Sequence, residues 1–290
     1  MSGVYEALRQ MEKEQAASAA VSDSHPANRL AESIAGPAEP DCVPAMNLKA
    51  SPSPRLVALW EPHGLGAEKF RALVTRLENL RRQKDMKSLQ VTSGVINEGK
   101  TLVATNLAVT FARRSRSKVL LLEGDLRRPS IAEILGQHGL RGISQWWSEE
   151  AEDIASYFYR LSEMSLWILS AGASIEQASH VLQSDRFAAA FHRLRAWFDW
   201  IVVDSTPMLP IADTNLWSRL VDGTLLVVRE GVASKRALKK GLQSLDNLKL
   251  IGTVLNEGSE LDRTGYANQY YGAGTSGKRK LSKQERITLD

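Results

Sequence analysis

The sequence predicts an α/β fold: a doubly wound, mostly parallel sheet with helices on both faces. Apolar runs of strand length alternate with helix-length stretches through the middle of the chain. Most of these runs are continuously apolar, which is typical of strands buried on both faces. The chain has 290 residues, 43% of them hydrophobic and 24% charged, so it can build one large domain or two small ones.

The expected elements begin with a helix from Glu68 to Arg82, where Phe70, Leu73 and Leu77 repeat at helical spacing. Further helices are expected at 101–114, 185–198 and 234–247. The expected strands are Leu89–Ser93, Lys118–Glu123, Leu166–Ser170, Trp200–Asp204, Gly223–Val228 and Leu250–Leu255. In such sheets ligands bind outside the carboxyl ends of the strands.

Composition divides the chain into three segments. Residues 1–55 are expected to be mobile, because the stretch from Ala16 to about Pro54 has too few large apolar groups to offset the entropy of ordering. A short amphipathic helix at 4–15 is either a frayed end or a docking element. Residues 56–262 form the folded domain. Residues 263–290, rich in Gly, Tyr and basic groups, form a flexible tail.

Bulk properties exclude some functions. The single cysteine, Cys42, rules out an internal disulfide and a cysteine-built metal site within one chain. No apolar run approaches the roughly 20 residues of a membrane helix, and the N-terminus lacks the apolar core of a secretion signal. A cytoplasmic protein is therefore expected. The net charge of +4 permits contact with an anionic membrane without requiring it, and no nucleic-acid partner is expected.

The most specific motif is Gly94-Val-Ile-Asn-Glu-Gly99-Lys100-Thr101, which fits the pattern G-x-x-x-x-G-K-S/T between a strand and a helix. Its backbone N–H groups can converge on phosphate, while Lys100 reaches the β and γ phosphates and Thr101 offers its hydroxyl to Mg²⁺. The plainer alternative is a glycine-containing turn without a ligand. The candidate nucleotide contacts are Gly94, Asn97, Glu98, Gly99, Lys100, Thr101 and Leu102.

Acidic residues end two of the expected strands. Glu123 and Asp125 follow one, and Asp204 ends another. A carboxylate at this edge can support Mg²⁺ or take a proton from an attacking hydroxyl. Metal support is favoured for Asp204 and the role of base for Asp125, with helix capping as the alternative for either. Arg127 and Arg128 come next and are either phosphate contacts or solvated side chains.

At these residues the chain resembles the bacterial tyrosine kinases of capsular and extracellular polysaccharide synthesis, relatives of the septum-placement and plasmid-partition ATPases. The resemblance covers roughly Glu68 to Asn256. Beyond the loop, its motifs are Asn106–Ala108, Leu121–Pro129, Asp204–Pro207, Leu209–Asp213, Val221–Gly223 and Val254–Asn256. It implies a metal-and-base motif at Glu123–Arg127, another motif at Asp204–Pro207, and Asn256 near the adenine.

The resemblance further implies an ATP-dependent, Mg²⁺-using kinase that phosphorylates tyrosines of its own tail, here Tyr266, Tyr270 and Tyr271. Family members are fused to a membrane-embedded chain-length regulator or dock on one as a separate protein at the inner face of the membrane, and this chain resembles the separate form. Family subunits form rings through Glu-x-x-Arg-x-x-Arg, which makes a homo-oligomer possible.

Three departures from the family pattern stand out. Glu123 replaces an Asp and extends its oxygens by roughly 1.5 Å. In the ring motif Glu68 and Arg71 match, but Val74 replaces the last arginine. The tail has only three tyrosines, so an ordinary polar tail is the alternative. A second functional hypothesis is an ATPase switch or scaffold that phosphorylates nothing. Such ATPases usually carry a lysine near the start of the loop, and its absence here favours the kinase.

Two remaining features keep alternatives open. Trp146 and Trp147 are either buried packing, which is favoured, or a partner-binding patch. The basic run at 278–280 either attracts an anionic membrane or is solvated.

Overall fold

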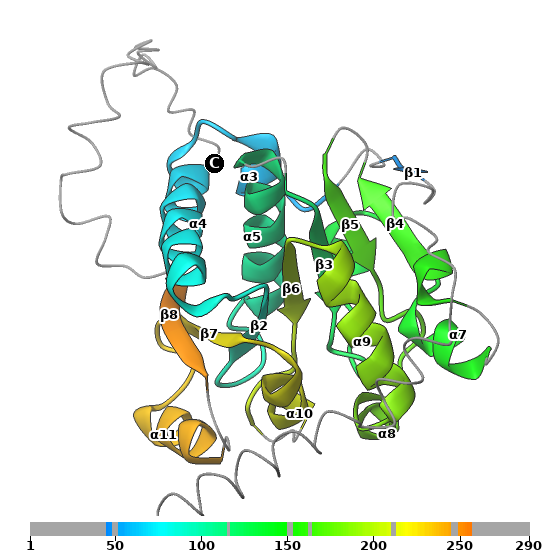
Figure 1. Ribbon diagram of the computed structural model, residues 1–290. Coiled ribbons are helices and arrows are strands. Elements are labelled where there is room, and N and C mark those ends of the chain that lie inside the picture. The colour runs from blue at the N-terminus through cyan, green and yellow to red at the C-terminus, as the bar shows by residue number, and fades with distance from the viewer. Residues whose placement is uncertain are drawn as a thin grey trace, which may run out of the picture.

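The computed structural model describes residues 45–47, 52–114, 117–149, 153–161, 164–209, 213–244 and 249–256. These residues form an eight-stranded sheet in the order β1-β4-β5-β3-β6-β2-β7-β8 (Figure 1). Every neighbouring pair is parallel except β4 and β5, which are antiparallel. The strands are β1 (Ala45–Met46), β2 (Ser88–Ser93), β3 (Val119–Glu123), β4 (Phe158–Leu161), β5 (Leu166–Leu169), β6 (Trp200–Asp204), β7 (Gly223–Arg229) and β8 (Leu250–Asn256).

Helices cover both faces of the sheet (Figure 1). The helices are α3 (Val57–Trp60), α4 (Leu65–Lys84), α5 (Lys100–Arg114), α6 (Ile131–Ile134), α7 (Ile143–Ser148), the 3₁₀ helix η2 (Ile154–Tyr157), α8 (Ala178–Leu182), α9 (Asp185–Trp197), α10 (Asp213–Leu220) and α11 (Lys235–Ser244). Helices α3 to α6 pack on the face that carries Val119 and Leu121. Helices α7 to α10 pack on the opposite face, against Leu120 and Leu122.

The predicted mostly parallel α/β architecture is confirmed. Strands β2, β3, β5 and β6 are buried along their whole length, because helices cover both of their faces. Aromatic packing fills the space between layers. Phe111 of α5 stacks on Trp200 of β6 with ring centroids 4.4 Å apart, and Phe187 of α9 meets Trp217 of α10 at 5.6 Å. The six expected strands match the observed ones to within one residue at each end.

The structure differs from the sequence prediction at one edge of the sheet. Strand β4 was not expected, because its half-polar sequence Phe-Tyr-Arg-Leu lacks the continuous apolar run of the central strands. Within the stretch from Ala16 to Pro54, which the sequence predicts to be a mobile linker, Ala45–Met46 form β1 beside β4. Met46 is buried in the core there, so two residues gain enough contact to be ordered despite the polar sequence around them.

The next part of the N-terminal segment is tied to α5. Asn106, buried in α5, accepts a hydrogen bond from the N–H of Ala58 at 2.9 Å and donates to the carbonyl of Arg55 at 3.1 Å. Leu56 between them is fully buried. The expected boundary at residue 56 therefore falls inside a packed region. The helix expected at 4–15 and the tail from 263 lie outside the described residues.

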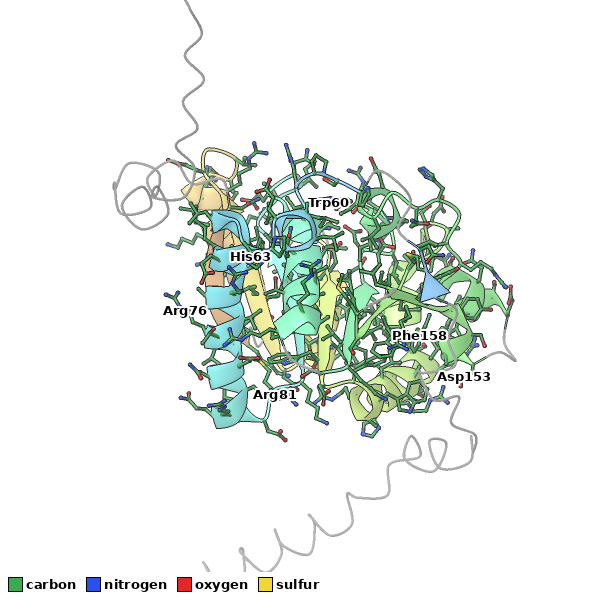
Figure 2. The ribbon with its side chains drawn as sticks, turned by 90° about the horizontal axis from the view of Figure 1, so that it is seen from above. Trp60, His63, Arg76, Arg81, Asp153 and Phe158 are labelled. Atoms are coloured by element: carbon green, nitrogen blue, oxygen red, sulfur yellow. The ribbon has the colours of Figure 1, made fainter. Side chains whose placement is uncertain are left out.

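Helix α4 shows why the ring motif departs from the family pattern. Val74 is fully buried in the hydrophobic core, where an arginine would lose its solvation. Glu68 accepts hydrogen bonds from the guanidinium of Arg71, through Nε at 2.8 Å, so the two matching residues pair within the helix. Arg76 is exposed on the outer side of α4 (Figure 2).

The tryptophan pair is packed, as favoured from the sequence. Trp146 is 2% exposed and meets Phe187 edge-on with ring centroids 6.2 Å apart. The guanidinium of Arg186 lies 4.2 Å above the Trp146 ring and donates to the carbonyls of both tryptophans. Trp147 is partly buried at the edge of this cluster. Within the described ranges, no helix has both the length and the apolar character needed to cross a membrane.

Candidate functional site

The loop at 94–99 leaves β2 and enters α5 at the carboxyl edge of the sheet. Asn97 and Gly99 have left-handed backbones, with φ of 64° and 89°. An added Cβ at Gly99 would lie 2.2 Å from Nδ2 of Asn256. This glycine is therefore required both for backbone shape and for close approach, as expected where consecutive N–H groups converge on an anion.

Glu98 and Asn256, two of the predicted nucleotide contacts, brace this loop. The buried Glu98 carboxylate accepts the N–H of Val95 at 2.8 Å and that of Arg229 at 3.3 Å. Nδ2 of Asn256 donates to the carbonyl of Glu98 at 2.9 Å. Proximity of Asn256 to an adenine stays a prediction, but its place beside the loop is clear.

The two ends of the predicted contact set are packed against other elements. Gly94 is buried, and an added Cβ would lie 2.6 Å from a methyl group of Leu238 in α11. Leu102 packs against the main hydrophobic core from the first turn of α5. A ligand at this loop would therefore meet the loop backbone more readily than the Leu102 side chain.

Three of the predicted catalytic residues meet directly after the loop. Nζ of Lys100 lies 2.9 Å from Oδ2 of Asp125 and 3.6 Å from Oδ1 of Asp204. The same ammonium donates to the hydroxyl of Thr101 at 3.3 Å. The parallel sheet causes this convergence, because the ends of β2, β3 and β6 lie side by side.

Burial perturbs the charges in this cluster. Asp204 is fully buried, and desolvation raises its pKa to about 6 although the Lys100 charge opposes that shift. Burial alone would lower the pKa of Lys100, but the Asp204 and Asp125 carboxylates outweigh it and raise that pKa. Among the described residues, neither carboxylate oxygen of Asp204 has a hydrogen-bond partner. Such a buried acceptor is costly unless a ligand uses it.

Asp125 belongs to the cluster and does not cap the next helix, whose N-cap residue is Ser130. One oxygen pairs with Lys100, and the other accepts the N–H of Arg128 at 3.1 Å. Arg127 is partly exposed, and its guanidinium is paired with an acid. Its Nε lies 2.8 Å from the buried carboxylate of Asp213, and this hydrogen bond raises the pKa of the guanidinium. Asp213 was not singled out as a site residue, since nothing in the local sequence indicates this distant partner.

Glu123 is buried near the cluster, but its oxygens are fully used elsewhere. Oε1 accepts the N–H groups of Ser130 and Ile131, at the start of α6. Oε2 accepts the hydroxyl of Ser170 at 2.8 Å and the N–H of Ala171 at 3.0 Å. The structure thus brings Lys100, Thr101, Asp125 and Asp204 together, while Glu123 bonds to two neighbouring segments.

The site suits a metal that keeps most of its own ligands. No group of three His, Cys, Asp or Glu side chains in the described part of the chain could enclose a metal. Mg²⁺ needs no such cage, because it binds through one or two carboxylates, waters and substrate phosphates. The unpartnered oxygens of Asp204 and the nearby Thr101 hydroxyl fit that requirement.

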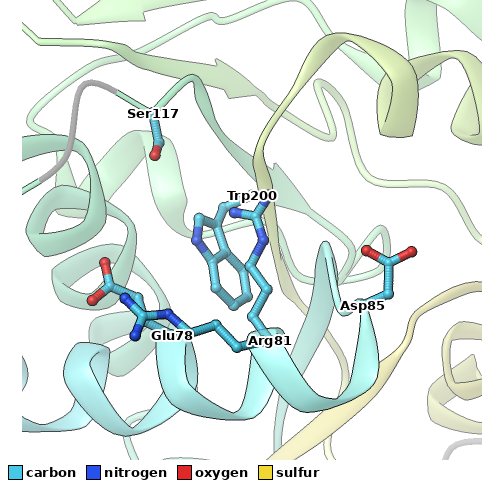
Figure 3. A pocket seen from close by; sticks show the side chains of 6 residues that line it. Glu78, Arg81, Asp85, Ser117 and Trp200 are labelled. Atoms are coloured by element: carbon cyan, nitrogen blue, oxygen red, sulfur yellow. The ribbon is translucent and has the colours of Figure 1, made fainter.

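A cavity of about 480 Å³ lies at the opposite edge of the sheet and is not part of this site (Figure 3). Trp200, the first residue of β6, lines it, and the guanidinium of Arg81 from α4 lies 5.2 Å above the tryptophan ring. The remaining lining residues are Glu78, Arg82, Asp85 and Ser117.

Known proteins share this sequence and arrangement, although no family model matches the chain. Tyrosine-protein kinase CpsD of Streptococcus pneumoniae serotype 4 is 31% identical over 193 residues, covering 66% of this chain and 83% of CpsD. The chain belongs to the bacterial tyrosine-protein kinase family. Tyrosine-protein kinase YwqD of Bacillus subtilis is 28% identical over 203 residues, covering 69% and 85%. The chain spans only 27% of ExoP of Rhizobium meliloti, a succinoglycan biosynthesis transport protein.

Solved structures agree with this membership. The kinase domain of the Escherichia coli tyrosine kinase Etk has a TM-score of 0.64 and 26% identity, covering 69% of this chain and 79% of that domain. The chimerical protein CapA2B2 has a TM-score of 0.65 and 25% identity, covering 70% and 89%. MinD of Pyrococcus horikoshii, complexed with Mg-ADP, shares the fold at a TM-score of 0.50 and 20% identity, covering 60% and 71%. As a tyrosine-protein kinase, the chain takes its phosphoryl group from a nucleotide.

Proposed function

We propose that the donor is ATP, that Mg²⁺ is required, and that the chain phosphorylates tyrosines of its own tail. The observation that carries this proposal is Lys100 held by Asp125 at 2.9 Å directly after the glycine loop. An ammonium in that place can exchange a carboxylate partner for phosphate oxygens. Asp204 ends β6, next to β2, and its oxygens accept no hydrogen bond from the described residues, so it adds the acid that a phosphate-bound metal requires.

The phosphoryl transfer follows from these positions. A tyrosine oxygen attacks the γ phosphorus while the bond from phosphorus to the β,γ-bridging oxygen breaks, giving phosphotyrosine and ADP. Asp125 accepts the phenolic proton, and Lys100 stabilises negative charge on the phosphates. Thr101, Asp204 and Asp125 are the residues that would hold Mg²⁺, which would supply positive charge against the phosphates.

The described tyrosines support the tail as acceptor. Tyr157 is 2% exposed and its hydroxyl donates to Glu149. The hydroxyl of Tyr159 accepts the N–H of Arg141 at 3.1 Å, on a half-buried side chain. Neither can reach an active site without leaving its partner. The chain has six tyrosines, and the other four are Tyr5, Tyr266, Tyr270 and Tyr271, which lie outside the described residues.

The name of one relative supports a role in polysaccharide production. ExoP of Rhizobium meliloti is a succinoglycan biosynthesis transport protein. We infer that this chain regulates capsular or exopolysaccharide polymerisation and export with a membrane-embedded chain-length regulator, recruited peripherally to the inner face of the cell membrane. A homo-oligomer remains part of this proposal, although Val74 removes one arginine of the family's ring motif.

The direct test incubates the full chain with MgATP and the cytoplasmic segment of its membrane partner, followed by phosphosite mapping by mass spectrometry. We expect phosphate on Tyr266, Tyr270 or Tyr271, its loss in Lys100→Met, and its retention in Lys84→Met, a control on the exposed end of α4. ATP turnover without phosphotyrosine would instead select the alternative, an ATPase switch or scaffold whose nucleotide state controls association with a membrane partner.

A further inference from the structure

Glu123 caps the N-terminus of α6, a role that the N-cap residue of a helix usually has. Ser130 is the N-cap residue of α6, yet its side chain makes no capping hydrogen bond. Serine at this position usually accepts an N–H of the first turn. Here the Glu123 carboxylate accepts the N–H groups of Ser130 and Ile131 instead, the latter at 2.7 Å. The Ser130 hydroxyl is thereby released for another contact.

That contact is with the predicted metal ligand. Oγ of Ser130 donates to Oγ1 of Thr101 at 3.2 Å, across from α6 to the first turn of α5. The other two hydrogen bonds of Glu123, to Ser170 and Ala171, fix its carboxylate from the end of β5. A chain of contacts therefore runs from β5 through Glu123 and Ser130 to Thr101.

We propose that Glu123 and Ser130 are positioning residues for the metal site, and that Glu123 is neither a metal ligand nor the catalytic base. This inference rests on the proposed use of Mg²⁺ with a nucleotide. A hydroxyl has one hydrogen to donate and two lone pairs to accept. With Ser130 donating to one lone pair, the Thr101 hydrogen can turn to the unpartnered Asp204 carboxylate and the second lone pair to the metal. Lys100 occupies that second position in this structure, at 3.3 Å.

The length of Glu123 matters to this arrangement. An Asp at position 123 would be shorter by one methylene, roughly 1.5 Å, so its carboxylate could not make all four contacts from the same backbone. The replacement that makes this chain depart from the family pattern thus changes what residue 123 does, and the role of base falls to Asp125.

Nucleotide-binding measurements on Ser130 variants test the inference without relying on kinase turnover. Titrating Mg²⁺ into the complex of the full chain with ADP should show affinity reduced about tenfold in Ser130→Ala, in the range typical of residues that orient metal ligands. ADP binding in EDTA and the melting temperature should stay at wild-type values. Ser130→Thr, which keeps the hydroxyl, should restore Mg²⁺ affinity. Ser148→Ala is the matched control, since within the described part of the chain that hydroxyl donates to the carbonyl of Gln145 in α7, away from the site.

Glu123→Gln completes the test. Positioning predicts weaker Mg²⁺ affinity, with little further loss when Ser130→Ala is added, because both changes break one chain of contacts. Wild-type Mg²⁺ affinity in Ser130→Ala, or phosphotransfer lost in Glu123→Gln with Mg²⁺ affinity intact, would overturn the inference. If Glu123→Gln fails to fold, the comparison of Ser130→Ala with Ser130→Thr still tests the inference. A wild-type chain that binds MgADP but forms no phosphotyrosine would refute the kinase proposal alone.

Discussion

The ends of β3 and β6 carry two buried acids that are opposites in hydrogen bonding. Glu123 and Asp204 are paired in register, and both are fully buried. Glu123 accepts four hydrogen bonds, whereas neither oxygen of Asp204 accepts a hydrogen bond from the described residues, and its Oδ1 faces the Lys100 ammonium at 3.6 Å. An acid at a strand end in this edge of the sheet is therefore not by itself a site residue. The number of donors already committed to it decides whether it can serve a ligand.

The largest effect should come from Asp204→Asn. Phosphotransfer is expected to fall by on the order of 10² or more, because a metal-supporting charge is lost. Stability should move the other way: the pKa of Asp204 rises from 3.8 to about 6 on folding, so ionised Asp204 costs up to about 3 kcal/mol at pH 7.5. Chemical denaturation should show a gain of about 1 to 3 kcal/mol. A loss of stability would contradict the assignment of Asp204 as an acid held open for ligand.

Glu123→Ala should lower the stability of the fold, in contrast to Asp204→Asn. Four donors lose their buried acceptor, and the free energy of unfolding is expected to fall by about 3 kcal/mol. Thermal melting should drop by roughly 5–10 °C for a domain of this size. Glu133→Ala, on an exposed position of α6, is the control and should melt like wild type. If Glu123→Ala melted at the same temperature as Glu133→Ala, the hydrogen bonds of Glu123 would not stabilise the fold, and the two strand ends would not differ in this way.

Mg²⁺ affinity and folding stability should depend on pH in opposite directions. Because the folded pKa of Asp204 is raised, protonation of this group favours the folded state, and its stabilising contribution is lost as pH rises from about 4 to about 6. Mg²⁺ must displace that proton, so the affinity of the ADP complex for Mg²⁺ should fall about tenfold per unit below pH 6. Calorimetry from pH 5 to 8 measures this slope. An equally steep slope in Asp204→Asn would assign the titration to another group.

The smallest effect is expected at the phosphate loop. There the Glu98 carboxylate, like that of Glu123, accepts hydrogen bonds from the protein's own backbone. Asn256→Ala removes the 2.9 Å hydrogen bond to the Glu98 carbonyl. At about 1 kcal/mol this should weaken nucleotide binding roughly fivefold. Thr253→Ala, exposed on the same strand, serves as the comparison. Fluorescence titration with a labelled nucleotide gives the ratio, and unchanged affinity would mean that the loop keeps its shape without this brace.

The sequence predicted what depends on local pattern. Continuous apolar runs located the central strands, and the position of Lys100, Asp125 and Asp204 after strand ends placed them in one cluster. It could not predict long-range hydrogen bonding. Nothing near Glu123 indicates that Ser170 will donate to it, and the Ser130 hydroxyl contact with Thr101 depends on how α6 packs against α5. The Ser at 130 before an apolar residue indicates a helix start, but not which side chain will cap it.

The tie between Asn106 and the N-terminal segment has a practical consequence for anyone who shortens this kinase. Composition suggests cutting at residue 56, yet the backbone just before it is hydrogen-bonded to the domain: Asn106 donates to the Arg55 carbonyl at 3.1 Å, and the Ser53 N–H donates to the carbonyl of Ile134 at 2.9 Å. A version beginning at 56 would strip those partners from α5 and α6, the two helices that carry Thr101 and follow Ser130. Fragments meant for enzymology should therefore start before residue 52.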